Sequence, residues 1–214
     1  MVTFRGNRFN ILFYNATAVY HHHKHIVSFV SSWPDPNGLL KAVKADAHQK
    51  VYFAGVRALG IIKKTITGLF FRLLGVEKSV LNMNVHLHQI QLCLERWSKD
   101  ASSLLAGEAL FNGEVVTRHK DAMISSLFEA SEDDELDILT QQALEVVCAP
   151  ILILLQRQAE EQLPGVKFWE TTEAEERKSA HVPTTNVVSE RDFAVLDNLL
   201  RAKPYGRSLS FEAY

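Results

Sequence analysis

The sequence predicts an all-α fold, an irregular multi-helix bundle with two long helices. Apolar residues recur with the 4,3 spacing of a helix face along much of the chain, and no stretch has the alternating pattern of a convincing sheet. Proline, glycine and asparagine divide the chain into segments of helical length. With 47% hydrophobic and 22% charged residues, the 214-residue chain has the composition of an ordinary globular protein with a packed core.

The first third of the chain is predicted to form four helices. Apolar residues at helical spacing run from Phe9 to Trp33, and the two prolines at 34 and 36 end this long segment. Shorter helices are expected over residues 37–46 and 49–60, and a further one over residues 61–74, which Gly75 stops.

The most regular apolar pattern lies in the middle of the chain. It repeats at 4,3,4,3,4,3 through Met83, Leu87, Ile90, Leu94, Trp97, Ala101 and Leu104. Such a repeat predicts a helix with one apolar seam. The flanking positions lack the regular charge pairs of a partner-specific coiled coil, so we expect this seam to pack within the domain.

A second long helix is predicted over Leu136–Gln162, after a connector at residues 107–116 and a helix over residues 117–130. Its inward face is expected to include Leu136, Leu139, Ala143 and Val146. Residues 146–155 are almost wholly apolar, which indicates the central buried element.

Local signals at both ends and in the middle of this helix predict its shape. Ser131 is expected to cap the helix, and the four acids at 132–135 suit the positive end of its dipole. Pro150 is expected to kink the helix, because it removes one backbone hydrogen bond and clashes with the preceding turn. Leu163-Pro164-Gly165 ends it.

Charge is distributed unevenly. Residues 1–75 contain 10 Lys and Arg against 2 Asp and Glu, and residues 76–135 contain 5 against 11. A basic segment attracts phosphate-rich partners through counterion release. Two interpretations of its cations stay open: a solvated helix face, or a surface that contacts a nucleic-acid backbone. The candidate contact residues are Arg57, Lys63, Lys64 and Arg72.

Histidines and cysteines offer few metal ligands. His21 and His25 share a face of the predicted first helix, at i and i+4, and His48 is the only further candidate for a shared ion. A structural zinc site takes four ligands, so we expect a solvated, partly packed histidine face and no metal. Cys93 and Cys148 lie among apolar residues, as reduced, buried thiols do. We therefore expect an intracellular protein, and the apolar run at 146–155 is too short to predict a membrane span.

The C-terminal block begins with a capping signal. Ser189 is a natural N-cap and Asp192 completes a Ser-x-x-Asp box, which places Glu190 in the first turn of the helix that this stretch opens and that continues over residues 195–203. The run Ser-Glu-Arg-Asp-Phe-Ala at 189–194, this helix and the final Leu-Ser-Phe-Glu-Ala-Tyr resemble the C-terminal block of hAT-type (hobo-Activator) DNA transposases, which reads Ser-Glu-Arg-x-Phe-Ser. Ala194 stands where that family usually has serine.

The resemblance implies a role for Glu190. In hAT-type transposases the matching glutamate is the third metal-binding carboxylate of an Asp-Asp-Glu site in a ribonuclease-H-like fold, and the block contributes to dimer formation. The close match covers about 25 residues. More loosely, blocks such as Arg8–Phe13 and Leu163–Gly165 resemble transposon-derived proteins of fish and cnidarians.

The remaining sequence predicts that Glu190 lacks catalytic partners. Two-metal phosphoryl transfer needs several carboxylates around ions about 4 Å apart. The aspartates of the family lie on or beside strands of the catalytic sheet, whereas everything before Glu190 is predicted as helix or connector. We therefore expect the ribonuclease-H-like sheet to be missing and no cofactor, with Mg²⁺ or Mn²⁺ bound only if a complete site were present.

These observations predict a transposon-derived helical protein or fragment without independent catalysis. Its expected organisation is a helical domain at 1–165, a polar linker at 166–185 and the C-terminal block at 186–214. The expected role is protein association, as a homo- or hetero-oligomer through the C-terminal block, with no membrane and an intracellular, in one interpretation nuclear, location. Three alternatives stay open: a nucleic-acid-binding module using residues 1–75, part of an active transposase if upstream sequence is missing, and a metal enzyme built around the histidines.

Overall fold

The computed structural model describes residues 8–35, 37–77, 79–108, 110–114 and 121–182, with 195, 198 and 201, and every secondary-structure element in this part of the chain is helical. The prediction of an all-α, multi-helix bundle is confirmed. The α-helices are α1 Arg8–His21, α2 His23–Ser32, α3 Gly38–Ala47, α4 Lys50–Ile62, α5 Gly68–Val76, α6 Met83–Trp97, α7 Ser102–Leu105, α8 Ala122–Phe128, α9 Asp134–Gln158 and α10 Glu173–Ser179. A π-helical turn, η1, covers Lys63–Thr67, and 3₁₀ turns cover η2 Val80–Asn82 and η3 Glu160–Gln162.

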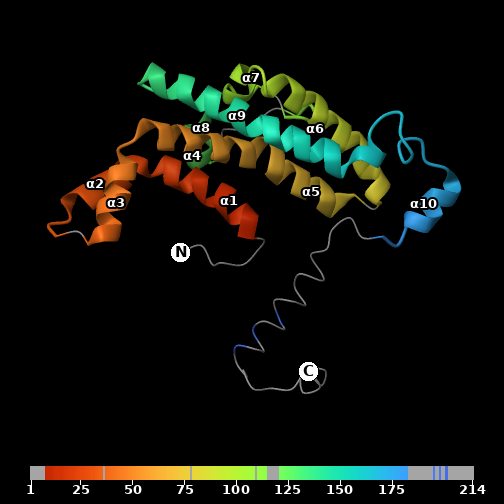
Figure 1. Cartoon of the computed structure of the whole chain (residues 1–214), viewed down its shortest axis with the longest axis horizontal. Helices are drawn as coiled ribbons and strands as arrows, with labels where there is room; N and C mark the ends of the chain where they lie inside the picture. The colour runs from red at the N-terminus through yellow and green to blue at the C-terminus, as the bar shows by residue number, and fades with distance from the viewer. Residues whose placement is uncertain are drawn as a thin grey trace.

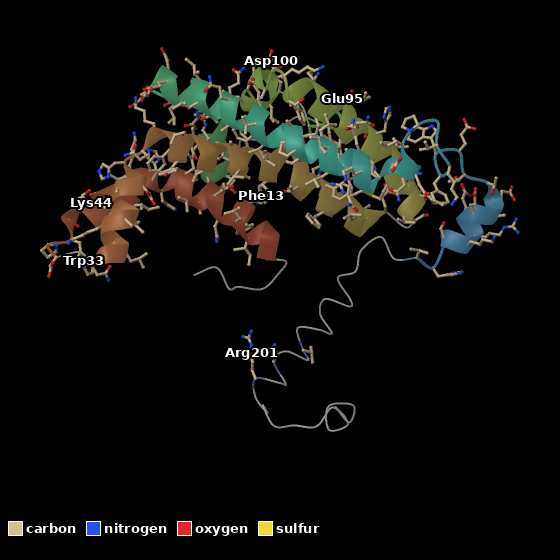
Figure 2. All side chains as sticks on the ribbon, in the orientation of Figure 1. Phe13, Trp33, Lys44, Glu95, Asp100 and Arg201 are labelled. Carbon is tan, nitrogen blue, oxygen red and sulfur yellow. The ribbon has the colours of Figure 1, made fainter. Side chains whose placement is uncertain are left out.

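The long helix α9 lies in the middle of the bundle. It packs along α4 on one side and along α6 on the other, and α1 in turn packs on α4 (Figure 1). The helices α2 and α3 form a hairpin at one end, where Figure 2 shows Trp33 and Lys44, and α10 lies at the opposite end. No residue of α3 is buried, so this hairpin adds little to the core.

The predicted apolar seam forms the centre of the core. All seven of its residues are buried, with Leu94 and Ala101 fully inaccessible and Trp97 and Leu104 each 1% exposed. From Ile90 on they pack with α4, α8 and α9 through residues such as Ile61, Leu127 and Leu144, whereas Met83 and Leu87 pack in a smaller cluster with Ala159. The helix itself ends at Trp97, and the last part of the seam continues into the loop before α7 and into α7.

The predicted long first helix is two helices. The helix breaks at His22, whose backbone leaves the helical region with φ −96° and ψ 8°. The ring Nδ1 of His23 lies 2.7 Å from the Tyr20 carbonyl oxygen, within hydrogen-bonding distance, and so compensates a backbone group at the break. Periodicity misses such a break because α2 resumes the helical spacing after a single residue.

The predicted boundary at Gly60 does not exist. The segments predicted over 49–60 and 61–74 are one run in which η1 joins α4 to α5. In this wider turn the Gly68 N–H donates to the Lys63 carbonyl, and the buried Thr65 hydroxyl donates to the Ile61 carbonyl at 2.8 Å. A π turn inside a helix is rare, and such turns are often found at functional sites.

Glycine at position 68 is required by this turn. A Cβ added there would lie 2.6 Å from the Lys63 carbonyl oxygen, so the backbone would have to shift. We expect Gly68→Ala to lower the free energy of unfolding by about 1–3 kcal/mol, as forced overpacking does. The matched variant Gly55→Ala, where a Cβ would meet nothing within 4 Å, is expected to raise it by about 0.4–1 kcal/mol. Urea unfolding followed by circular dichroism measures both, and equal effects would contradict the requirement.

The start of α9 differs in detail from the prediction. Asp133 is the N-cap, with its side chain accepting from the Glu135 N–H, while the Ser131 hydroxyl accepts from the Asp133 N–H. The prediction that Ser131 caps this helix is therefore wrong, and the cap lies two residues later in the sequence. Of the four acids at 132–135, Asp134 and Glu135 occupy the first turn as expected, while Asp133 is the N-cap and Glu132 precedes it. The helix ends at Gln158, four residues before the predicted end, and η3 follows.

Helix α9 runs through Pro150. Proline at this position leaves the carbonyl of Val146, four residues earlier, without its helical partner. Val146 is 71% exposed and Pro150 is also exposed, so water can hydrate that carbonyl. The position of Pro150 thus marks the side of α9 that faces outward.

Candidate functional site

Among the described residues, the outer face of α9 is an apolar surface that does not pack into the core. We define it by residues that are all exposed: Ile138, Gln142, Val146, Pro150, Ile153 and Leu154. The four large aliphatic side chains among them are between 55% and 71% exposed, with Val146 at the centre the most exposed. At 100° per residue these positions share one side of the helix. An apolar line of this kind is typical of a surface that another molecule covers.

The inward face of α9 only partly matches the prediction. Leu136 and Ala143 pack against the core as expected, but the expected inward residue Val146 points outward. The fully buried positions are Thr140, Leu144 and Cys148. The prediction failed because residues 146–155 are apolar on every side of the helix, so hydrophobicity there does not tell inside from outside.

Arg57 fixes the start of α9 to the bundle. Its guanidinium is 1% exposed, pairs with the Asp137 carboxylate, and donates to the carbonyls of Leu127 at 2.8 Å and Glu129 at 2.6 Å. Its charge is therefore fully used inside the protein. Of the two interpretations that the sequence leaves open for Arg57, its burial favours neither a solvated face nor a surface contact, because this face of α4 lies under α8 and α9.

Lys50 makes the second link between α4 and α9. Its ammonium lies 2.7 Å from Asp133 and 2.5 Å from Glu135. Hydrogen bonds to these two carboxylates raise the pKa of Lys50, and the hydrogen bond from Lys50 is the largest cause of the lowered pKa of Asp133. Part of the basic charge of the first third therefore pairs with the acidic segment that follows it in the sequence.

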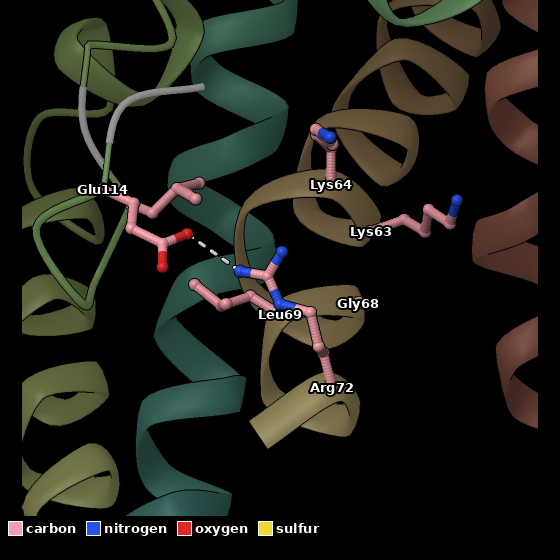
Figure 3. Close-up of a pocket in the computed structure, with 7 residues that line it drawn as sticks. Lys63, Lys64, Gly68, Leu69, Arg72 and Glu114 are labelled. Atoms are coloured by element: carbon pink, nitrogen blue, oxygen red, sulfur yellow. Dashed lines mark hydrogen bonds and ion pairs between the residues drawn. The ribbon is translucent and has the colours of Figure 1, made fainter. Parts of the chain in front are cut away.

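The other predicted cations surround a small pocket between η1, α5 and the turn at residues 110–114. Lys63, Lys64 and Arg72 line this pocket of about 220 Å³, with Leu69, Leu110 and Glu114. Figure 3 shows that Arg72 turns toward Glu114, with which it forms an ion pair at 2.8 Å, whereas Lys63 points the other way. The three cations are neighbours but do not converge on one point.

Lys63 is used within the fold. Its ammonium lies 4.5 Å from the centre of the Tyr14 ring in α1, which is a cation–π contact. Burial lowers the pKa of Lys63, and the nearby charge of Lys64 lowers it further. Of the four predicted phosphate contacts, one is buried, one lies over an aromatic ring and one is paired with a carboxylate, which weakens the case for a continuous phosphate-binding surface.

The three histidines considered as metal ligands do not come together. His21 ends α1 and its Nδ1 lies 3.1 Å from the Ser126 hydroxyl of α8, His25 belongs to α2, and the Nδ1 of His48 lies 2.6 Å from the Lys44 carbonyl. The break at His22 places His21 and His25 in different helices. Within the described ranges no group of three or more His, Cys, Asp or Glu is placed to hold a metal ion.

The two thiols lie where the sequence places them. Cys148 is fully buried on the inward side of α9, and burial raises its pKa to about 12. Cys93 is partly buried on α6, and burial raises its pKa as well. Both are free. Thiols of this kind stay protonated at neutral pH and react slowly.

Glu190 and the rest of the capped block at residues 186–194 lie outside the described residues. Its predicted position in a first helical turn stays a prediction. The same holds for the oligomer expected through the C-terminal block.

By length and composition alone, α9 is long and apolar enough to cross a membrane. The core helix of a soluble protein passes the same test. The prediction of no membrane association, which was made from the shorter run at 146–155, stays a prediction.

Comparisons with known proteins identify no similar protein. No protein-family model, no curated protein and no solved structure matches the chain. The resemblance to hAT-type transposases therefore remains a prediction from residues 189–214.

Proposed function

We propose that this chain acts by binding protein, without a catalytic site of its own, and that the outer face of α9 is the binding surface. The observation that carries the proposal is the exposure of four large aliphatic side chains along one side of the central helix. Full burial of one such side chain is worth about 1.5–3 kcal/mol relative to full exposure. Covering four half-exposed chains therefore gives a partner several kcal/mol of favourable energy.

The scaffold under this surface supports a binding role. Arg57 and Lys50 hold the first turn of α9, and Leu144 and Cys148 pack its middle against the core. A helix fixed in this way presents its outer face with little loss of conformational entropy on binding. The resemblance of residues 189–194 to the hAT-type block supports a transposon-derived origin. On this proposal the chain has kept protein association and has lost catalysis.

Photo-crosslinking in cells that make the chain tests the proposal. A benzoylphenylalanine at position 146 is expected to give covalent adducts with protein, because Val146 would lie in the centre of the covered surface. The matched control is the same residue at position 99, where Lys99 is exposed in the turn after α6. Position 99 is expected to give few adducts, and the absence of adducts above this level at position 146 would refute the proposal.

A further inference from the structure

We infer that the protein covering the outer face of α9 is a second copy of this chain, packed antiparallel about a twofold axis at Val146. This inference rests on the proposed function and names its partner. Twofold dimers are the commonest symmetric assemblies, and a residue on the axis contacts its own copy. Val146 is the most exposed aliphatic residue of the outer face, as the centre of such an interface requires.

The outer face is symmetric in kind about Val146. Ile138 and Leu154 lie the same number of residues before and after it, and both are more than half exposed. In an antiparallel pair Ile138 of each copy meets Leu154 of the other, while the two Val146 side chains meet at the axis. Every large apolar group at these positions then has an apolar partner. A parallel pair in the same register would also give each group an apolar partner, its own copy, so apolar contacts alone do not decide the direction.

Charge decides between the two directions. Glu135 and Arg157 also lie equally far from Val146, on the same side of the helix, and Arg157 is the basic residue of the last turn. An antiparallel pair sets Arg157 of each copy beside Glu135 of the other. It also places the positive end of each helix dipole beside the negative end of the other. A parallel pair would instead bring together two first turns that each hold Asp134 and Glu135, since Asp137 is already paired with Arg57.

The acids after Arg157 do not remove this preference. Glu160 and Glu161 belong to η3, which begins after the chain has left the helix at Ala159, with φ −105° and ψ 16°. At the other end, Lys50 already offsets part of the charge of Asp133 and Glu135. The pair between Glu135 and Arg157 is exposed, so it selects the direction and adds about 0–1 kcal/mol.

A protein surface suits the outer face better than a lipid surface. Helices that lie on anionic membranes carry lysine and arginine along their polar side. In α9 the charged residues are instead acids at the start, Glu145 in the middle and a single arginine near the end. The polar Gln142 also interrupts the apolar line, which a second polypeptide tolerates through a hydrogen bond.

Cysteine pairing tests the direction and the register. Under mild oxidation, full-length Val146→Cys is expected to form a disulfide-linked dimer, since residues at the axis approach within the 4.4–6.8 Å that a disulfide spans between Cα atoms. Ile138→Cys and Leu154→Cys are each expected to form no disulfide-linked dimer alone and to form a linked dimer when mixed. The unsubstituted chain, whose Cys93 and Cys148 are partly or fully buried, gives the background. Linked dimers of Ile138→Cys with itself would show a parallel pair and overturn the inference.

Sedimentation velocity of the purified chain tests the partner. The unsubstituted protein is expected to shift from monomer to dimer as its concentration rises, and Val146→Asp to weaken the dimer at least tenfold with an unchanged circular dichroism spectrum. The matched control Val85→Asp, on an exposed position of α6, is expected to leave the dimer intact.

Three outcomes would overturn the second-copy inference: a chain that stays monomeric to 100 µM, equal effects of the two Asp variants, or flotation with phosphatidylcholine vesicles that Val146→Asp abolishes. If the chain is monomeric while photo-adducts join position 146 to a different protein, the proposed function stands and the inference fails. If position 146 gives no adducts at all, the proposed function fails too.

Discussion

Arg57→Ala is expected to lower the free energy of unfolding by about 3–5 kcal/mol, the loss that follows removal of one partner from a buried ion pair. The change leaves the Asp137 carboxylate and the carbonyls of Leu127 and Glu129 without the guanidinium that now satisfies them. It also leaves a cavity under α8 and α9. For a chain of this size the loss corresponds to a fall of about 6–20 °C in the thermal midpoint.

Arg72→Ala is the matched control. Arg72 also pairs with a carboxylate, that of Glu114 at 2.8 Å, but both side chains are more than half exposed. Exposed pairs contribute about 0–1 kcal/mol, so the two arginine variants should differ several-fold when urea unfolding is followed at 222 nm. Similar losses for both variants would show that Arg57 is not the internal link between α4, α8 and α9.

The contrast between the two arginines shows what charge counts miss. The sequence separates a basic first third from an acidic middle, and this separation suggested a surface for phosphates. In the structure Lys50 and Arg72 instead pair with carboxylates of the acidic segment, and Arg57 pairs with Asp137 just after it. Opposite charges far apart in a sequence attract each other in the fold, and only the packing of α4 against α9 reveals which ones meet.

Much of the fold was predictable because one periodic signal dominates it. The seam from Met83 to Leu104 is buried at every position, and the helix predicted over residues 37–46 forms, with the Asn37 side chain accepting from the Leu40 N–H at 2.9 Å. The break at His22 and the π turn at residues 63–67 were not predictable from spacing. Each shifts the helical phase locally while the apolar pattern continues around it.

The outer face of α9 was missed, although two signals mark it. Pro150 inside a helix favours an outward position, where water can hydrate the carbonyl that proline leaves unpaired. The line through Gln142, Val146 and Pro150 at i, i+4 also forms a second helical side, opposite Leu144 and Cys148. The almost uniformly apolar run hides both signals, because every side of the helix there is apolar enough to face the core.

Leu144→Ala is expected to cost about 2–5 kcal/mol of unfolding free energy, while Val146→Ala, two residues away on the same helix, costs less than 1 kcal/mol in the monomer. Leu144 is completely inaccessible and belongs to the core that joins α9 to α4, α6 and α8, so the lost methyl groups leave a cavity. Val146 is 71% exposed and loses little contact. Urea unfolding measures both at a concentration below that of self-association.

Repeating the measurement at high protein concentration separates packing from association. Leu144→Ala should lose the same amount at both concentrations, because its contacts lie within one chain. Val146→Ala should lose more at the higher concentration, where binding between copies adds to the stability of the folded state. A large loss for Val146→Ala at low concentration would show that Val146 packs in the core. The outer face on which the association depends would then not exist.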